Sequence, residues 1–589
     1  MTEYAPPLAD LEFVLAHVTD LDAVAKLNGF QHADRETVAG VLAEAGRFFA
    51  EVIAPTNRHG DLEGSRLVDG SVRTPSGFRE VYRTYLDAGW AGVHLPEAWG
   101  GGGMPLLVGM AVHEMFKSSN LALSLCTMLT QASIDALMEH GSPEQQATYL
   151  EKLVTGEWSG TMCLTEPHAG SDVGALTSRA EPQADGSYRI SGQKIFITWG
   201  DQDLTENVIH LVLARTPGSA PGTKGISLFL VPKYLPDAAG LPGERNAYEI
   251  VSLEHKLGIH ASPTCVVEFT GATGYLVGEE QQGMRYMFTM MNTARIEVGA
   301  EGLAVGERAY QQASSYSRER TQGRAVGAEP GESSPIIDHP DVRRMLLSMR
   351  SQLEAMRALL YTTVYSVDHH RHAVEESVRA FHGDRVALLT PIVKAWLTDR
   401  GVEIASTALQ VHGGMGYVEE TGAAQFYRDS RISPIYEGTN GIQAIDLVLR
   451  KIPLSGGEAV AALLDEMEAT AGELGDKDND LGTRLTGAVA TGREVTAWLS
   501  DRLEAGGYQD ALAAATPYLD LMGTLAGGWL MGRSWLAATR QLELEEGDRR
   551  FLEQKLTTCR FYLTQLLPKV EGLAPQVMAG ADILYATDL

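Results

Sequence analysis

The first quarter of the chain has apolar residues at helical spacing. From about Arg35 to Gly156 they recur every three or four positions, and the glycine-rich turn Gly100–Gly103 interrupts them. This pattern is typical of helices that bury one face. We therefore expect an N-terminal helical domain over residues 1–158.

Between Ser159 and about Gly283 the pattern changes to short runs of β-branched and aromatic residues, separated by Gly, Pro, Asp and Asn. Such runs indicate strands joined by turns. We expect a middle domain of antiparallel strands over residues 159–283. Its clearest predicted strands are Tyr188–Ile190, Lys194–Thr198, Val208–Ala214, Ile226–Val231 and Cys265–Phe269.

Helical spacing resumes near Met284 and predicts three or four long helices, which we interpret as a four-helix-bundle domain over residues 284–453. A Ser/Gly joint at Leu454–Gly457 follows. At least four more helical patterns then predict an extra C-terminal helical domain over residues 454–589, with breaks at Asp476–Asp480, Gly506–Gly507 and Glu545–Asp548. The predicted fold class is α+β.

Composition narrows the function classes. A formal net charge of -28 over 589 residues repels phosphate backbones, so we expect no nucleic-acid partner. The four cysteines stand singly, which suggests neither disulfides nor a metal site. Apolar stretches such as Leu106–Val112 are far shorter than the roughly 20 residues that span a bilayer. Since the acidic N-terminus also lacks the pattern of an export signal, we expect a cytoplasmic protein without an integral membrane segment.

Three segments are too specific to be ordinary turns, whereas the dinucleotide fingerprint, the P-loop and the zincin motif are absent. In Thr161–Gly174 an apolar strand leads into a loop of hydroxyls and small residues, which lets a ligand approach the main chain. Ile195–Gly200 combines two aromatic residues with a hydroxyl, as a flat ligand requires. Gln410–Tyr417 is followed by Ile435–Asn440, where Glu437 stands in a mostly apolar context.

These segments, in this order, resemble the acyl-CoA dehydrogenase family of flavoproteins. The resemblance covers about residues 85 to 450 and includes the loop Gly89–Gly101. The C-terminal domain lies outside the common family core and is similar to the extension of very-long-chain members and of long bacterial members.

The resemblance implies FAD as the cofactor. Phe196 stands where many members have Trp, and Arg320 matches an arginine that meets the FAD of a neighbouring subunit. The implied FAD-binding residues are Met162, Leu164, Thr165, Ser171, Phe196, Thr198, Arg320, Gln410, Gly413, Gly414 and Thr439. The implied substrate-binding residues are Ser171, Asn292, Arg295 and Gly438, with Asn292 in place of the usual Asp.

The resemblance also implies the reaction. Glu437 would abstract the α-proton of an acyl-CoA thioester, flavin N5 would accept the hydride, and the product would be the trans-2-enoyl-CoA. Members that place the base elsewhere have a Glu before the arginine of the CoA-binding helix, where this chain has Ala294. The expected electron acceptor is an electron-transfer flavoprotein, as in fatty acid β-oxidation.

Two alternatives stay open at this point. An acyl-CoA oxidase would use the same residues and pass electrons to oxygen. A non-catalytic DNA-binding flavoprotein of the same fold would need a basic C-terminal surface, which the 21 acidic and 11 basic residues of 454–589 argue against. The role of Arg320 predicts a homodimer, and Gly528–Gly532, with small residues four apart, permits a close helix contact that favours it.

Overall fold

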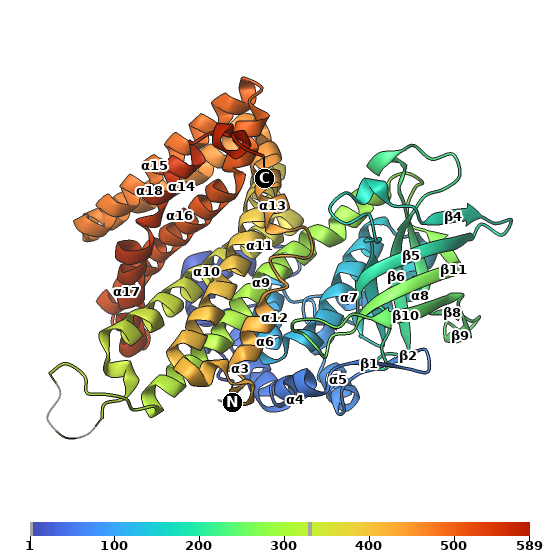
Figure 1. The fold of residues 1–589 in the computed structure, drawn as a ribbon, viewed down its shortest axis with the longest axis horizontal. Coiled ribbons are helices and arrows are strands. Elements are labelled where there is room, and N and C mark those ends of the chain that lie inside the picture. The colour runs from blue at the N-terminus through green and yellow to red at the C-terminus, as the bar shows by residue number, and fades with distance from the viewer. Residues whose placement is uncertain (1–3, 328–330, 332, 589) are drawn as a thin grey trace. The chain divides into compact units, whose positions relative to one another are not determined.

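The computed structural model describes residues 4–327, 331 and 333–588, and its fold is α+β as predicted (Figure 1). The chain divides into two compact units that interleave along the sequence. The sheet unit comprises Phe48–Met104 and Ser119–Glu297, and the helical unit comprises Met1–Arg47, Pro105–Ser118 and Val298–Leu589. The four sequence-based domain boundaries stay a prediction.

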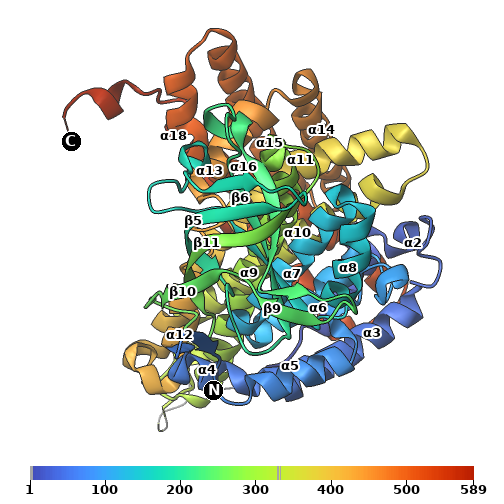
Figure 2. The same ribbon diagram turned by 90° about the vertical axis from the view of Figure 1, so that its right-hand side faces the viewer.

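The sheet unit is built on a seven-stranded sheet in the order β3-β6-β7-β11-β5-β4, with β10 paired to β11. Strands β5 and β11 run side by side (Figure 2). All pairs are antiparallel except β3 with β6, because the chain between them forms β4 and β5 and so has the length to return in the same direction. The strands are β3 (Trp158–Cys163), β4 (Arg179–Pro182), β5 (Tyr188–Thr198), β6 (Asn207–Ala214), β7 (Ser227–Pro232), β10 (Tyr248–Leu253) and β11 (Thr264–Leu276).

Strand β5 joins two runs that the sequence pattern separates. Gly192 lies in the middle of β5 and pairs with Phe269 of β11, so the ladder continues across the glycine. A Cβ at Gly192 would lie 2.5 Å from Ser178 Oγ, which explains why only glycine fits there. The remaining strands form two small ribbons: β1 (Arg66–Val68) with β2 (Ser71–Arg73), and β8 (Tyr234–Pro236) with β9 (Pro242–Arg245).

Helix α7 (Leu121–His140) packs against β3 and is the most apolar helix of the sheet unit. It is long and apolar enough to cross a membrane, but 89% of its most apolar window is buried inside the structure. We therefore interpret α7 as a core helix. The other helices of this unit are α4 (Pro55–Glu63), α5 (Phe78–Asp87) and α8 (Pro143–Val154).

The helical unit contains three long helices that follow the sheet in sequence. A Cβ at Gly302 would lie 2.4 Å from the carbonyl oxygen of Leu397, so α9 and α11 touch backbone to backbone at this point. The helices are α1 (Leu8–Phe13), α2 (Leu21–Val24), α3 (Arg35–Phe48), α6 (Leu106–Ser119), α9 (Gly283–Glu319), α10 (Pro340–His372), α11 (Glu376–His412), α12 (Ala423–Ser430) and α13 (Asn440–Asp446). The first turns of α9 belong to the sheet unit.

The C-terminal extension is helical as predicted, and α14, α15, α16 and α18 lie side by side (Figure 1). Gly528 and Gly532 of α16 face Leu567 and Leu485 of the same chain, and Trp529 between them is buried. The interpretation of Gly528–Gly532 as a contact between subunits is therefore wrong. The helices are α14 (Glu458–Lys477), α15 (Asn479–Glu504), α16 (Tyr508–Glu543), α17 (Arg549–Phe561) and α18 (Lys569–Val577).

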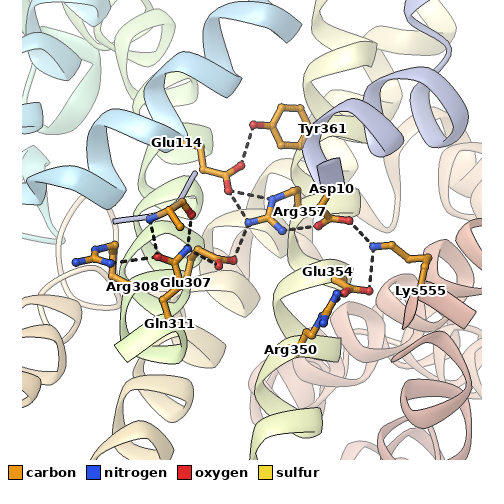
Figure 3. Close-up of polar contacts among 11 residues, drawn as sticks. Asp10, Glu114, Glu307, Arg308, Gln311, Arg350, Glu354, Arg357, Tyr361 and Lys555 are labelled. Carbon is orange, nitrogen blue, oxygen red and sulfur yellow. Dashed lines mark hydrogen bonds and ion pairs between the residues drawn. The ribbon is translucent and has the colours of Figure 1, made fainter. Parts of the chain in front are cut away.

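A buried cluster of charges lies in the helical unit around Arg357 of α10, and we call it the Arg357 cluster. Arg357 donates to Asp10 at 2.5 Å, to Glu114 at 2.7 Å and to Glu307 at 3.0 Å. The hydroxyl of Tyr361 donates to the other oxygen of Glu114 at 2.8 Å. Figure 3 shows the guanidinium between Glu114 and Asp10.

The same cluster reaches the C-terminal extension through Lys555 of α17. Lys555 is 1% exposed and pairs with both Asp10 and Glu354. Arg350 and the hydroxyl of Thr558 also donate to Glu354, at 2.9 Å and 2.5 Å. Segments of helices α1, α6, α9, α10 and α17 are thus joined by ion pairs that water does not screen.

Candidate active site

In the sheet unit, the loop after β3 is closed by a carboxylate that the sequence analysis did not single out. Glu166 is 2% exposed and accepts hydrogen bonds from Lys194, at 2.8 Å, and from the backbone and hydroxyl groups of Thr177 and Ser178. Burial alone would raise the pKa of Glu166, but the charge of Lys194 lowers it to about 2. Glu166 therefore stays ionised and fixes the course of residues 164–178.

This closure places Thr165 beside the end of β5. The backbone N–H of Ile195 donates to the carbonyl oxygen of Thr165 at 2.9 Å, and Lys194 Nζ donates to the carbonyl oxygen of Leu164 at 3.0 Å. Of the residues implied to bind the flavin, Leu164 and Thr165 are half-buried, whereas Met162 is buried on β3.

The end of β5 has an unusual backbone. Phe196 and Trp199 have φ values of 60° and 54°, in the left-handed backbone region that residues other than glycine rarely adopt. The indole of Trp199 is fully buried and donates to the carbonyl oxygen of Ala122 at 3.1 Å. The ring of Phe196, in contrast, is 57% exposed. Strain of this kind persists where the surroundings fix it, and it is concentrated at functional sites.

A flat heteroaromatic ring fits this place on chemical grounds. Neither the Thr165 hydroxyl nor the Thr198 hydroxyl makes a hydrogen bond to another part of the described chain. The two hydroxyls and the exposed Phe196 ring thus offer hydrogen-bond partners and a stacking surface. Ser171 is exposed in the loop after β3.

Helix α9 carries the two residues implied to hold the CoA. Asn292 is exposed, and Arg295 is 8% exposed with its guanidinium 5.9 Å from the centroid of the Phe288 ring. The distance from Arg295 Nη1 to Asn292 Oδ1 is 3.5 Å, at the limit of a hydrogen bond. Both residues belong to the sheet unit.

In the helical unit, the ends of α9 and α11 come together. The rings of Tyr316 and His412 stack with their centroids 4.6 Å apart. Arg320 is exposed one residue beyond α9, and its N–H donates to the carbonyl oxygen of Tyr316 at 2.9 Å. In the segment that follows α11, Gly413 has φ 58°, and Cβ atoms added to Gly413 and Gly414 would meet nothing within 4 Å. Gln410 is also exposed, so this segment is open to a ligand.

Glu437 stands in a short closed loop between α12 and α13. The loop, residues 434–440, is closed by the N–H of Asn440, which donates to the carbonyl oxygen of Pro434 at 3.0 Å. Glu437 is half-buried and has φ 55°, and Gly438 after it has φ 82°. The side chain of Thr439 caps α13 by accepting from the N–H of Ile442 at 3.2 Å.

Buried polar contacts hold both sides of this loop. Before Glu437, the hydroxyls of Ser433 and Tyr436 donate to Glu301 Oε2 of α9 at 2.8 Å and 2.5 Å. After it, the side chain of Asn440 accepts from Lys394 Nζ of α11 at 2.9 Å and donates to backbone and side-chain oxygens of that helix. The left-handed backbone of Glu437 is thus imposed from two neighbouring helices.

The sequence analysis missed Glu166 and Glu301, although both had a signal. Glu301 lies in the small and apolar run Val298–Ala304, and Lys194 lies in a predicted strand. A lone charge in such a run is costly unless a partner is buried with it. Neither run identifies its partner, which comes from a distant part of the chain.

Four family models match successive parts of the chain. They are the acyl-CoA dehydrogenase N-terminal domain over residues 36–157, the middle domain over 161–272 and the C-terminal domain over 281–452. An acetyl-CoA dehydrogenase C-terminal-like model matches residues 463–588. Together they include the candidate-site segments, whereas helices α1 and α2 precede the first match.

Individual proteins extend this result. The chain is 46% identical over 589 residues to 3-methylmercaptopropionyl-CoA dehydrogenase of Ruegeria pomeroyi, with 100% of both chains covered. Its fold is similar to Caenorhabditis elegans ACDH-11 solved with C11-CoA, with a TM-score of 0.79, 20% identity and 99% and 96% of the chains covered. For a Bacillus anthracis acyl-CoA dehydrogenase solved with FAD, the TM-score is 0.74 at 21% identity, over 98% and 93% of the chains. The chain belongs to the acyl-CoA dehydrogenase family.

Proposed function

We propose that this acyl-CoA dehydrogenase converts an acyl-CoA thioester to the trans-2-enoyl-CoA with FAD as its cofactor and Glu437 as the base. One observation carries the assignment of Glu437: a carboxylate stands at a strained position of a short loop that buried contacts hold on both sides. Ala294 precedes Arg295, so the other position that family members use for the base holds no carboxylate here.

The chemistry explains why such a carboxylate is needed. The thioester acidifies its α-carbon, yet that proton is hard to remove at neutral pH, so the base must be fixed close to it. FAD, when bound, supplies the acceptor for the hydride that leaves the β-carbon. An acyl chain that displaces water from the site raises the pKa of Glu437, which strengthens it as a base.

We assign the cofactor and the substrate to the residues that the family resemblance implies. We assign the flavin ring to Met162, Leu164, Thr165, Phe196 and Thr198, since these provide the exposed ring and the hydroxyls without partners. The more distant parts of FAD are assigned to Ser171, Arg320, Gln410, Gly413, Gly414 and Thr439, and the acyl-CoA to Ser171, Asn292, Arg295 and Gly438.

We further propose that the enzyme is a cytoplasmic homodimer that passes electrons to an electron-transfer flavoprotein, as in β-oxidation. The exposure of Arg320 supports the dimer, because its guanidinium lies at the surface, where it donates to Gln322 Oε1 at 3.2 Å. The relative at 46% identity makes 3-methylmercaptopropionyl-CoA the first substrate to test, beside straight-chain acyl-CoAs of several lengths. Oxygen consumption without an added acceptor would instead identify an oxidase.

The decisive experiment is Glu437→Gln, which keeps the size of the side chain and removes the base. We expect the variant to bind FAD and acyl-CoA normally. Flavin bleaching by substrate should slow by roughly 10²–10⁴-fold, the usual contribution of a general base. Stopped-flow absorbance measures this rate, and near-normal bleaching would reject Glu437 as the base.

A further inference from the structure

Glu301 of α9 is a buried carboxylate that the reaction scheme above does not use. It is 0% exposed, and only its Oε2 has partners, namely the hydroxyls of Ser433 and Tyr436. Its Oε1 has no hydrogen-bond partner within the described parts of the chain. A buried oxygen left in this state costs stability, so its retention requires a reason.

The position of the two hydroxyls supplies that reason. Tyr436 immediately precedes Glu437, and Ser433 lies one residue before the closed loop 434–440. The Tyr436 hydroxyl is 2.5 Å from Glu301 Oε2, the short distance of a bond to a charged acceptor. A non-glycine residue in the left-handed region relaxes unless neighbouring contacts hold it.

The surroundings of Glu301 let its charge change near neutral pH. Burial raises the pKa of Glu301 to about 7, against the opposing effects of Tyr436, Lys117 of α6, Ser433 and Lys394 of α11. Lys117 and Lys394 act through their charges, and Lys394 Nζ donates its described hydrogen bond to Asn440.

We propose that Glu301 is a positioning residue for Glu437: its carboxylate holds Tyr436 and Ser433, and through them the loop that carries the base. The proposal rests on Glu437 being the base. Ionised Glu301 accepts both hydroxyls strongly and fixes the loop for proton abstraction. Protonated Glu301 holds them more weakly, so the base is less well placed and turnover is slower.

The test is Glu301→Gln, which keeps the volume and an acceptor oxygen but never carries the charge. Above pH 8 we expect kcat to fall about 10- to 100-fold, the range for a misplaced catalytic group, with little change in KM. Near pH 5.5 the ratio of wild-type to variant kcat should approach one, because Glu301 is then protonated in the wild type. A ratio that stays constant with pH, or a kcat equal to wild type throughout, would overturn the proposal.

A second variant tests the proposal independently of whether Glu301→Gln folds normally. Tyr436→Phe removes one hydroxyl and should lower kcat in the same pH-dependent way, and combining it with Glu301→Gln should add little. Additive losses would mean that the two residues act separately and would contradict the proposal.

Asp368→Asn is the matched control. Asp368 is also buried, and burial raises its pKa to about 7, but it accepts from the N–H groups of Leu106 and Leu107 at the start of α6. Its substitution should leave the pH profile of kcat unchanged. Glu437→Gln, measured in parallel, separates two failures: normal bleaching there rejects the proposed function, whereas a slow Glu437→Gln with an unaffected Glu301→Gln rejects only the role of Glu301.

Discussion

The Arg357 cluster and Glu301 are both buried in the helical unit, but their carboxylates have direct partners of different kinds. In the Arg357 cluster, four carboxylates contact three cations directly: Asp10, Glu114, Glu307 and Glu354 with Arg350, Arg357 and Lys555. Glu301 is equally buried, but its direct partners are two hydroxyls. Burial alone would raise the pKa of Asp10, yet Lys555 and Arg357 lower it to about 2, while the pKa of Glu301 rises to about 7.

The difference shows what direct cation partners do for a buried acid. They lower the pKa of Asp10 to about 2, so Asp10 is charged at neutral pH and its part of the cluster is a fixed joint between helices. Burial raises the pKa of Glu114 despite Arg357 and Tyr361, so the carboxylates that share Arg357 do not hold their charge equally. Glu301, held by hydroxyls, keeps the ability to titrate, and one of these hydroxyls belongs to Tyr436, the residue before Glu437.

Removing the cation at the centre of the cluster should have the largest effect. Arg357→Met leaves Asp10, Glu114 and Glu307 buried around an apolar side chain. We expect the free energy of unfolding to fall by about 3–5 kcal/mol, as for other broken buried ion pairs. Urea denaturation followed by circular dichroism measures it. Arg350→Met is the control: its partner Glu354 keeps Lys555, so its loss should be smaller, and equal losses would contradict a special role of Arg357.

Glu301→Gln should change the free energy of unfolding in the opposite direction from Arg357→Met. Because the pKa of Glu301 rises from 4.5 to about 7 on folding, ionising it costs stability. Wild type therefore loses about 3 kcal/mol between pH 4.5 and pH 7, at roughly 1.4 kcal/mol per pKa unit, and the variant does not. The variant should gain on wild type as the pH rises, in denaturation curves at pH 5 and pH 8. A difference independent of pH would disprove this.

Asp10→Asn should remove a smaller pH dependence of the free energy of unfolding, which lies at acid pH. The lowered pKa of Asp10, from 3.8 to about 2, stabilises the fold above about pH 4, and this contribution is lost as the pH falls toward 2. Its full size is about 2 kcal/mol. Comparing wild type and variant between pH 5 and pH 3 should show wild type losing stability faster. Parallel curves would mean that Asp10 is not held by its cations.

The sequence predicts features that depend on neighbouring residues. Helix α14 ends at Lys477 and α15 begins at Asn479, within the predicted break, because Asp478 caps α15 by accepting from the N–H of Leu481. Similarly, Asp548 caps α17. Local sequence patterns, together with the family resemblance, also select the hydroxyls, aromatic residues and glycines of the candidate site.

What the sequence does not predict depends on contacts between distant residues. Glu301 meets Ser433 and Tyr436 across 132 and 135 positions, and Glu166 meets Lys194 across 28. Likewise, the buried faces of Gly528 and Gly532 follow from the helices that pack on them. Local patterns show that a buried charge or a small residue needs a neighbour, but only the fold identifies it.

The contact of Lys555 with Asp10 also sets an order of events during synthesis. The two residues are 545 positions apart, so at roughly 5–20 residues per second the ribosome needs about 30 to 110 seconds to supply the lysine after the aspartate. During that interval helix α1 lacks one of its two cationic partners, and the surface destined for α17 is uncovered. The ion-paired joint between α1, α10 and α17 is therefore completed only after the ribosome has supplied Lys555.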